Sequence, residues 1–100
     1  MSEKKIERYL TNEVKKLGGI SYKFISPGNA GVPDRILIMP GGHVHFVELK
    51  TETGRLSKIQ EAQHKKLFEL GVIPWTLYGE SDVKRFLSLL KLDLVDDEDE

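Results

Sequence analysis

Apolar and polar positions along the chain change from helical to strand spacing and back, which predicts the element order αβββαβα. The first helix should cover residues 2–19 and end at Gly18-Gly19, where a glycine C-cap belongs. It is marked by apolar residues at helical spacing: Ile6, Leu10, Val14 and Leu17.

Three strands should follow the first helix. Residues 20–25 (ISYKFI) form a short β-rich run, and the turn-forming loop SPGNAGVP separates it from the next strand. Residues 31–50 (GVPDRILIMPGGHVHFVELK) then read as two apolar strands around a Pro-Gly-Gly turn. This hairpin contains an aspartate, a glutamate and a lysine, which strands packed into a core normally exclude.

The second half of the chain predicts a helix, a strand and a further helix. Ser57 and Gln60 have capping-box spacing at the start of a helix that ends at Gly71. Its apolar residues are Ile59, Leu67, Phe68 and Leu70. The stretch VIPWTLYG should form a strand, with Pro74 at its start or on a sheet edge, and SDVKRFLSLLKL should form an amphipathic helix.

Composition and charge narrow the class of protein. One hundred residues make one domain, and the element order gives it the α/β class. The chain has no cysteine, which excludes disulfides, thiolate zinc sites and cysteine nucleophiles. No apolar run approaches the ~20 residues of a membrane span, and the N-terminus lacks the apolar core of a signal peptide. We therefore expect a soluble, intracellular protein located in the cytoplasm.

The acids are concentrated at the C-terminus. Residues 93–100 (DLVDDEDE) hold six acids and no base, so residues 1–92 hold 15 Lys and Arg against 10 Asp and Glu, a net charge of +5. This balance is compatible with a nucleic-acid partner. We expect the domain to end at residue 92 and a disordered, solubilising tail to follow, or an acidic strip that competes with a polyanion for the basic surface.

The charged residues of the hairpin can be placed by strand alternation. Glu48 and Lys50 share one face of the second strand because side chains alternate between faces. If Pro-Gly-Gly forms a three-residue loop, Met39 pairs with His43 and Asp34 falls opposite Glu48, with Cβ atoms about 5 Å apart. A two-residue loop would spoil this register, and the sequence alone leaves both open.

Two facing carboxylates need an explanation, because at that distance they repel by roughly 3 kcal/mol at an effective dielectric constant of ~20. A hard divalent cation with oxygen ligands would favour the arrangement. Mg²⁺ or Mn²⁺ suits it better than zinc, since the cluster has neither cysteine nor histidine on its face. A salt bridge of Lys50 with Asp34 or Glu48 would explain the same residues without a metal.

Several blocks of this sequence resemble one nuclease family. VPD at 32–34 and ELK at 48–50 look like the PD-(D/E)xK signature of restriction-endonuclease-like folds, whose core has the same element order. SEKKIERYL, SPGNAGVPDRI, PGGHVHFVELK and GRLSKIQ together resemble the virus-type replication and repair nuclease (VRR-NUC) domain over about residues 2–90. The short, stand-alone chain is similar to the phage and bacterial members, which implies a location in a bacterial or phage-infected cell.

The resemblance implies a catalytic site. Asp34 and Glu48 match the metal-binding acids of the family, the main-chain carbonyl of Leu49 matches a further ligand, and Lys50 matches the catalytic lysine. It implies that Mg²⁺ or Mn²⁺ polarises the scissile phosphate and activates water, while the lysine orients or deprotonates that water. The expected reaction is hydrolysis of a phosphodiester bond in DNA.

The family also has an acid on the first helix, and here Glu3 and Glu7 are both available. At about 100° per residue, Glu3 lies roughly 25° from the centre of the apolar stripe and Glu7 roughly 65°. We favour Glu3 as the metal ligand, although both glutamates would also suit the dipole of a solvated helix N-terminus.

Other polar residues have a functional and a local interpretation. Gln60 matches a site-supporting glutamine of the family, yet a capping box with Ser57 explains it equally well. Ser26, Asn29 and Arg35 border the expected cleft, where they could hold phosphates, but a turn-rich loop and a strand-edge cation need no function.

The remaining candidates look structural. The three histidines have no ligand spacing and are interpreted as surface or partly buried residues: His43, His45 and His64. Trp75 and Tyr78 on the fourth strand are expected in the core.

The small size of the domain suggests how it would act on DNA. One small domain offers one cleavage centre, so symmetric cutting of both strands of a DNA structure requires a homodimer, and two-fold symmetry would match a four-way (Holliday) junction. Small relatives resemble dimeric junction-cutting enzymes. A less specific or flap-type nuclease, and a module that binds branched DNA without cutting it, remain as alternatives.

Overall fold

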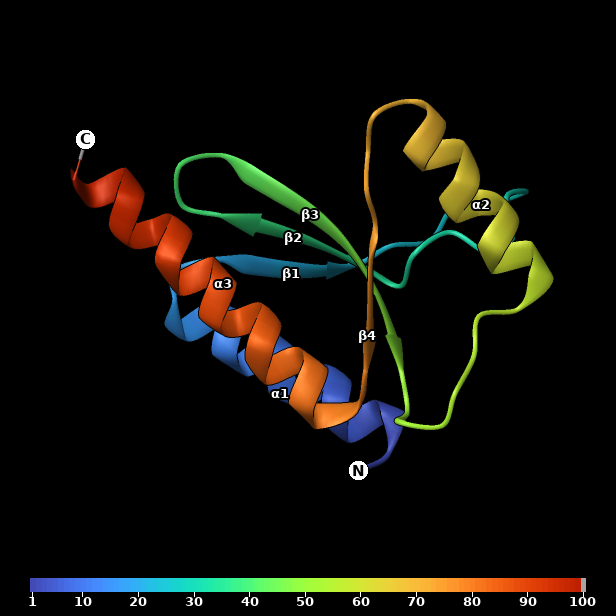
Figure 1. The fold of residues 1–100 in the computed structure, drawn as a ribbon, viewed down its shortest axis with the longest axis horizontal. Helices are drawn as coiled ribbons and strands as arrows, with labels where there is room; N and C mark the ends of the chain where they lie inside the picture. The colour runs from blue at the N-terminus through green and yellow to red at the C-terminus, as the bar shows by residue number, and fades with distance from the viewer. Residues whose placement is uncertain (100) are drawn as a thin grey trace.

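The computed structural model describes the backbone of residues 1–99 and the side chains of residues 1–94. Its elements have the predicted order αβββαβα (Figure 1). They are α1 (Glu3–Lys16), β1 (Ile20–Lys23), β2 (Arg35–Met39), β3 (His43–Lys50), α2 (Lys58–Glu69), β4 (Trp75–Tyr78) and α3 (Gly79–Asp99). No helix in the described part of the chain is both long and apolar enough to cross a membrane.

The four strands form one mixed sheet in the order β1-β2-β3-β4. The first three are antiparallel to their neighbours, and β4 runs parallel to β3 because α2 lies in the crossover between them. Met39 pairs with His43, so the turn has three residues, which is one of the two loop lengths that the sequence left open. Both of its glycines have positive φ, which explains the Gly-Gly sequence: Gly41 and Gly42.

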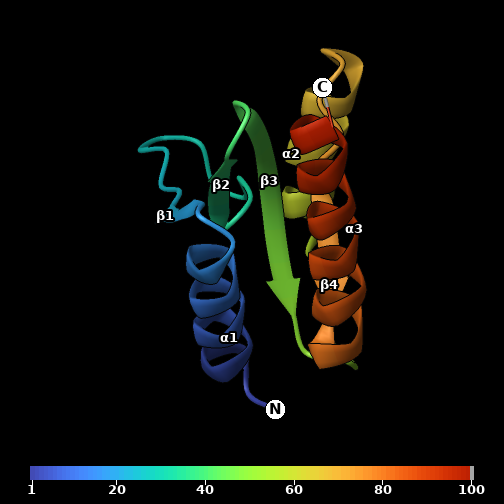
Figure 2. The same ribbon diagram turned by 90° about the vertical axis from the view of Figure 1, so that its left-hand side faces the viewer.

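One face of the sheet carries the main core. Helices α1 and α3 contact each other and run alongside the strands (Figures 1 and 2). The apolar stripe predicted for α1 is buried at Ile6, Leu10 and Val14, and Leu17 packs at the margin. The core side chains of the strands and α3 are Leu37, Met39, Val47, Leu49, Leu77, Val83, Phe86, Leu87 and Leu90.

Helix α2 stands apart from this core. Ser57 caps it through the predicted capping box, with both hydrogen bonds to Gln60 present. None of its residues is fully buried. Its start touches the loop between β1 and β2, where a Cβ added at Gly31 would lie 2.7 Å from the carbonyl oxygen of Ile59. The glycine therefore allows this loop to dock on α2.

The C-terminal helix is longer than the sequence predicts. It begins at Gly79, two residues before the expected start, and its backbone is helical through Asp99. The expected tail, residues 93–100, therefore overlaps the end of α3, and its disorder stays a prediction; residue 100 lies outside the described residues. Leu94 packs against the core beyond the expected end, which gives a physical reason for the extension. The domain boundary at residue 92 stays a prediction.

The fourth strand divides the two aromatic residues between opposite faces. Trp75 packs against the core with its ring 5.0 Å from that of Phe86, as expected. Tyr78 pairs with Lys50 and lies on the opposite face from Leu77, which is buried. The prediction that Tyr78 is a core residue is therefore wrong.

His45 is held within an aromatic group beneath α3. Its Nδ1 accepts a hydrogen bond of 3.3 Å from Nε1 of Trp75, and its ring is perpendicular to Phe86 at 5.8 Å. Burial lowers the pKa of His45, and the charge of Asp93 only partly opposes this. The folded protein thus favours the neutral ring.

This burial predicts a loss of stability in acid. Because the folded-state pKa of His45 is lowered, its contribution is complete above about pH 6.5 and is lost as pH falls toward the lowered value. His45→Gln, which can still accept from Trp75, should remove this component. Chemical unfolding between pH 8 and 5 should show a smaller stability difference between wild type and variant at low pH. A constant difference would contradict the prediction.

Candidate active site

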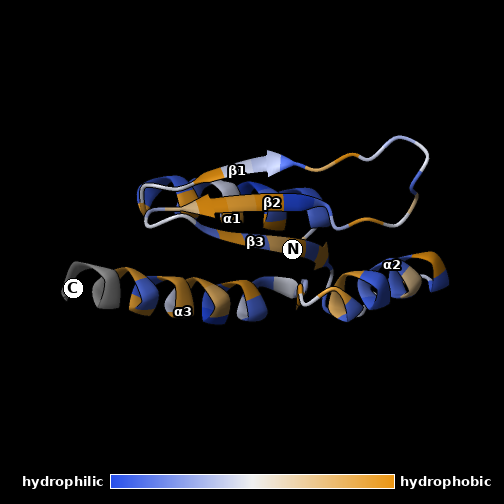
Figure 3. Ribbon diagram, turned by 90° about the horizontal axis from the view of Figure 1, so that it is seen from above, coloured by the Kyte–Doolittle hydropathy of each residue, from blue (hydrophilic) through white to orange (hydrophobic). Residues whose placement is uncertain are grey.

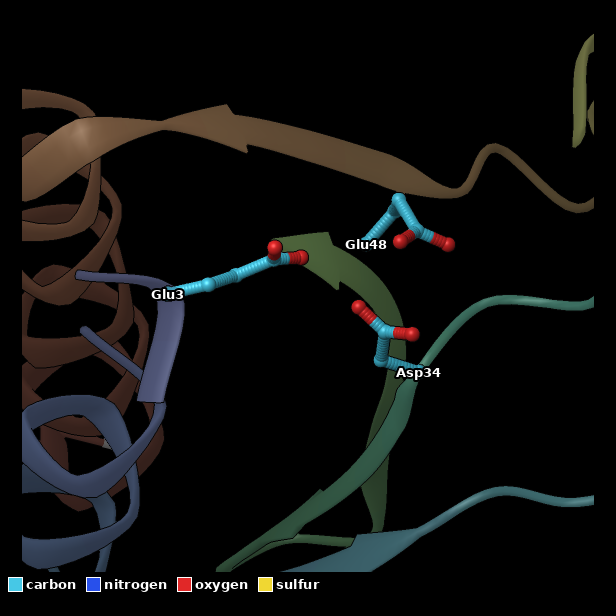
Figure 4. A group of neighbouring side chains, drawn as sticks. All are labelled: Glu3, Asp34 and Glu48. Atoms are coloured by element: carbon cyan, nitrogen blue, oxygen red, sulfur yellow. The ribbon is translucent and has the colours of Figure 1, made fainter. Parts of the chain in front are cut away.

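Three carboxylates from separate elements meet at one end of the sheet. Glu3 comes from the first turn of α1, Asp34 directly precedes β2, and Glu48 lies near the end of β3. Figure 4 shows Glu3 extending from α1 toward the other two side chains. An oxygen of each lies within 4.8 Å of the others. The β2–β3 register produces this group because it continues to Asp34 opposite Glu48.

Glu48 is unusual because it is a buried acid. Its side chain is 1% exposed, and its Oε1 is buried without a hydrogen-bond partner among the described residues. Burial, followed by the hydrogen bond and charge of Asp34, raises the pKa of Glu48 to about 8. An orphaned carboxylate oxygen beside a second acid is what a bound cation would satisfy.

The group fits a hard divalent cation. All three residues offer carboxylate oxygens, which Mg²⁺ and Mn²⁺ prefer. Asp34 is fixed for this because its Oδ2 accepts a 3.2 Å hydrogen bond from the backbone N–H of Leu49. The side chain of Leu49 is buried in the core, which anchors the strand between Glu48 and Lys50.

Lys50 lies on the same face of β3 as Glu48 and is half-buried. Among the residues described, no acid lies within salt-bridge distance of its ammonium group, so the structure contains no salt bridge from Lys50 to Asp34 or Glu48. Its positive charge nevertheless lowers the pKa of Glu48, which means that the two groups are neighbours. Lys50 is therefore available to a ligand.

The two helix acids have different surroundings. Glu3 joins the carboxylate group, whereas Glu7 forms an ion pair with Arg35. This pair uses both residues in local structure. It leaves Glu3 as the only acid of α1 that reaches the other carboxylates in the described structure, in agreement with the helix geometry.

The remaining candidates have local partners. The Oγ of Ser26 accepts a 3.0 Å hydrogen bond from the side-chain amide of Asn29, which closes the turn in this loop. Gln60 uses Oε1 in the capping box. In the described part of the chain, no hydrogen bond joins Ser26 or Asn29 to the carboxylates.

Two residues near the site were not recognised as candidates from the sequence. Tyr78 is the parallel-strand partner of Lys50, and the charges of Asp34 and Lys50 both act on His64. The signal for Tyr78 was strand alternation, which puts it on the face opposite Leu77. The signal for His64 was its spacing of four residues from Gln60 on one helix face.

The carboxylate group predicts an unusual stability effect in metal-free protein. Because the pKa of Glu48 is raised, its stability contribution is complete below about pH 4.5 and is lost as pH rises through about 8. Asp34→Asn should therefore stabilise the protein in EDTA at pH 9 by about 1–3 kcal/mol, and much less at pH 6. Urea unfolding measures both values. Destabilisation at pH 9 would show that the Asp34 charge is needed by the fold.

Comparison with known proteins supports one family. The chain is 48% identical over 69 residues to "Putative nuclease p44" of Acyrthosiphon pisum secondary endosymbiont phage 1, which covers 69% of this chain and 74% of that protein. No family model matches the sequence.

Solved structures agree with this relative. A VRR_NUC domain superposes with a TM-score of 0.81 at 25% identity, covering 86% of this chain and 94% of the other. A VRR_NUC domain protein reaches a TM-score of 0.68 at 15% identity, over 92% and 87% of the two chains, which shows the fold alone. The phage relative and the first of these structures agree with the element order and the carboxylate group. The chain therefore belongs to the virus-type replication and repair nuclease (VRR-NUC) family, as a small VRR-NUC domain.

Proposed function

We propose that the protein is a Mg²⁺- or Mn²⁺-dependent endodeoxyribonuclease that acts on branched DNA, and that as a homodimer it resolves four-way (Holliday) junctions. The observation that carries the nuclease assignment is the group of three carboxylates beside Lys50, which has no ion-pair partner among the described residues. The relative's description as a nuclease supports the same activity, and its phage source supports action inside a bacterial or phage-infected cell.

Each site residue has a defined task in this proposal. Glu3, Asp34 and Glu48 would hold the cation with the carbonyl of Leu49, and the cation would supply Lewis-acid polarisation of the phosphate and acidification of water. Glu48 must lose its proton before its oxygens can bind a cation, so affinity should increase as pH rises through about 8.

Lys50 would act on the reacting groups themselves. Its ammonium group has no protein partner in the described structure, so it can donate hydrogen bonds to the attacking water and to a phosphate oxygen. In this position it orients the nucleophile and stabilises the negative charge that develops on the phosphate. Its place on the same face as Glu48 puts this charge beside the metal-binding acids.

The homodimer is supported by an apolar sheet surface. Ile20, Ile38 and Val44 are aligned across β1, β2 and β3, and all three are exposed, as is Tyr22. They lie on the face opposite the buried Leu37. In Figure 3 no helix lies in front of the hydrophobic strand β2, and α1 lies behind it. A second copy could cover this surface and bring a second cleavage centre.

The metal assignment predicts selective effects on thermal melting. Mn²⁺ should raise the melting temperature of wild type, because it binds the folded state, and should do so more strongly at pH 8.5 than at pH 6.5. Glu3→Gln and Glu48→Gln should lose most of this shift. Glu7→Gln is the matched control, since it breaks the ion pair with Arg35 but should keep the shift. Equal loss in both helix variants would contradict the ligand assignment.

Cleavage of labelled four-way junction, flap and duplex DNA tests the activity. Wild type with Mg²⁺ or Mn²⁺ should make paired symmetric nicks in the junction, and Lys50→Ala should slow cleavage by about 100-fold or more. Sedimentation of the same preparation should show a dimer at micromolar concentration.

The other outcomes separate the alternatives. Preference for flap or duplex DNA, or a strict monomer, would exclude junction resolution while keeping the nuclease. DNA binding without cleavage would identify a non-catalytic module for branched DNA.

A further inference from the structure

Helix α2 differs from an ordinary surface helix because mostly polar residues face the protein and large apolar residues face solvent. Its half-buried residues form one stripe at positions i, i+3, i+4 and i+7: Gln60, Gln63, His64 and Leu67. Three of these four are polar. Its large apolar residues point outward instead, with Ile59 58% exposed and Phe68 63% exposed. The inward stripe therefore cannot be explained by hydrophobic burial alone.

Within this stripe, His64 has a buried ring nitrogen, Nε2, that lacks a hydrogen-bond partner among the described residues. Burial lowers the pKa of His64, the charge of Asp34 opposes this shift, and the charge of Lys50 adds to it. The charges of Asp34 and Lys50 therefore both reach the imidazole ring of His64.

The carboxylate group itself does not account for His64. The ligand atoms that gather within 4.8 Å of one another come from Glu3, Asp34 and Glu48, and no nitrogen of His64 joins them. A metal bound by those oxygens would leave the imidazole outside its ligand set. The charges of Asp34 and Lys50 both act on this ring, so a substrate bound at the site can supply the partner that its Nε2 lacks among the described residues.

We propose that His64 is a substrate-binding residue of the nuclease site, which donates a hydrogen bond from Nε2 to a non-bridging oxygen of the phosphodiester. This proposal rests on the nuclease function argued above. The imidazole has a tautomer that carries hydrogen on Nε2 and donates there, and phosphate oxygens are strong acceptors. Lys50 would contact the same phosphate, so that β3 and α2 hold it from two elements.

The capping box gives this residue a fixed position. Ser57 and Gln60 fasten the first turn of α2, and His64 lies one turn further on the same face. The contact of Gly31 with Ile59 holds that end of the helix against the loop that leads to Asp34.

The test compares His64→Ala and His64→Gln with Glu61→Ala, a matched control at an exposed position of the same helix. The probe is whichever of the labelled junction, flap or duplex DNAs wild type cleaves fastest, with Mn²⁺. His64→Ala should lower kcat/KM by roughly 10- to 100-fold, because a hydrogen bond to a charged oxygen is lost. His64→Gln, whose amide can donate from a similar position, should recover part of this loss, and Glu61→Ala should match wild type.

A second readout separates substrate binding from metal binding. The Mn²⁺-induced melting shift of DNA-free protein should be the same in wild type and His64→Ala. Cleavage by His64→Ala within about threefold of wild type would overturn the proposal, and loss of the Mn²⁺ shift would show instead that His64 supports the metal site. If wild type cleaves no DNA at all, the nuclease function fails, and this inference fails with it.

Discussion

The register between β2 and β3 is the constraint on which the site depends. The three-residue turn pairs Met39 with His43, and every later pair follows, up to the meeting of Asp34 and Glu48. A slip of one residue would turn each side chain of a strand to the other face, which would expose Val47 and Leu49 and bury Lys50. The hydrophobic core and the acidic group therefore enforce the same register, and the core supplies the free energy that holds the acids together.

This arrangement explains how a small domain can keep a buried acid. Strand β3 alternates core residues with site residues, so Leu49 packs under α1 and α3 while Glu48 and Lys50 point to the opposite face. The backbone N–H of Leu49 also fixes Asp34. Burial of Glu48 opposes folding at high pH, and the protein tolerates it because proton or cation binding can relieve the charge.

The sequence predicted the features that depend on local patterns. The capping box of α2, the apolar stripe of α1, the turn at Gly41-Gly42 and the element order all follow from short-range spacing, and the structure contains them. Side-chain alternation brings Asp34 opposite Glu48 only with a three-residue turn, a length that the sequence left open and that the structure shows. The choice between Glu3 and Glu7 needed only helix geometry, although the ion pair that engages Glu7 could not be foreseen because Arg35 is 28 residues away.

What the sequence could not supply was the orientation of elements with few apolar anchors. Apolar spacing normally shows which face of a helix is buried, but α2 turns Phe68 outward and His64 inward. Its position is set by polar caps and by the close approach of Gly31, neither of which leaves a periodic signal. Tyr78 was misplaced for a related reason, since its aromatic character suggested the core while its parity with Lys50 put it on the site face. In both cases the surroundings of the charged site residues override the hydrophobic pattern, as expected where a surface is shaped by what it binds. Tyr78 pairs with Lys50 and His64 is affected by the charge of Lys50, so two residues that the sequence placed poorly are neighbours of the lysine proposed to contact the phosphate.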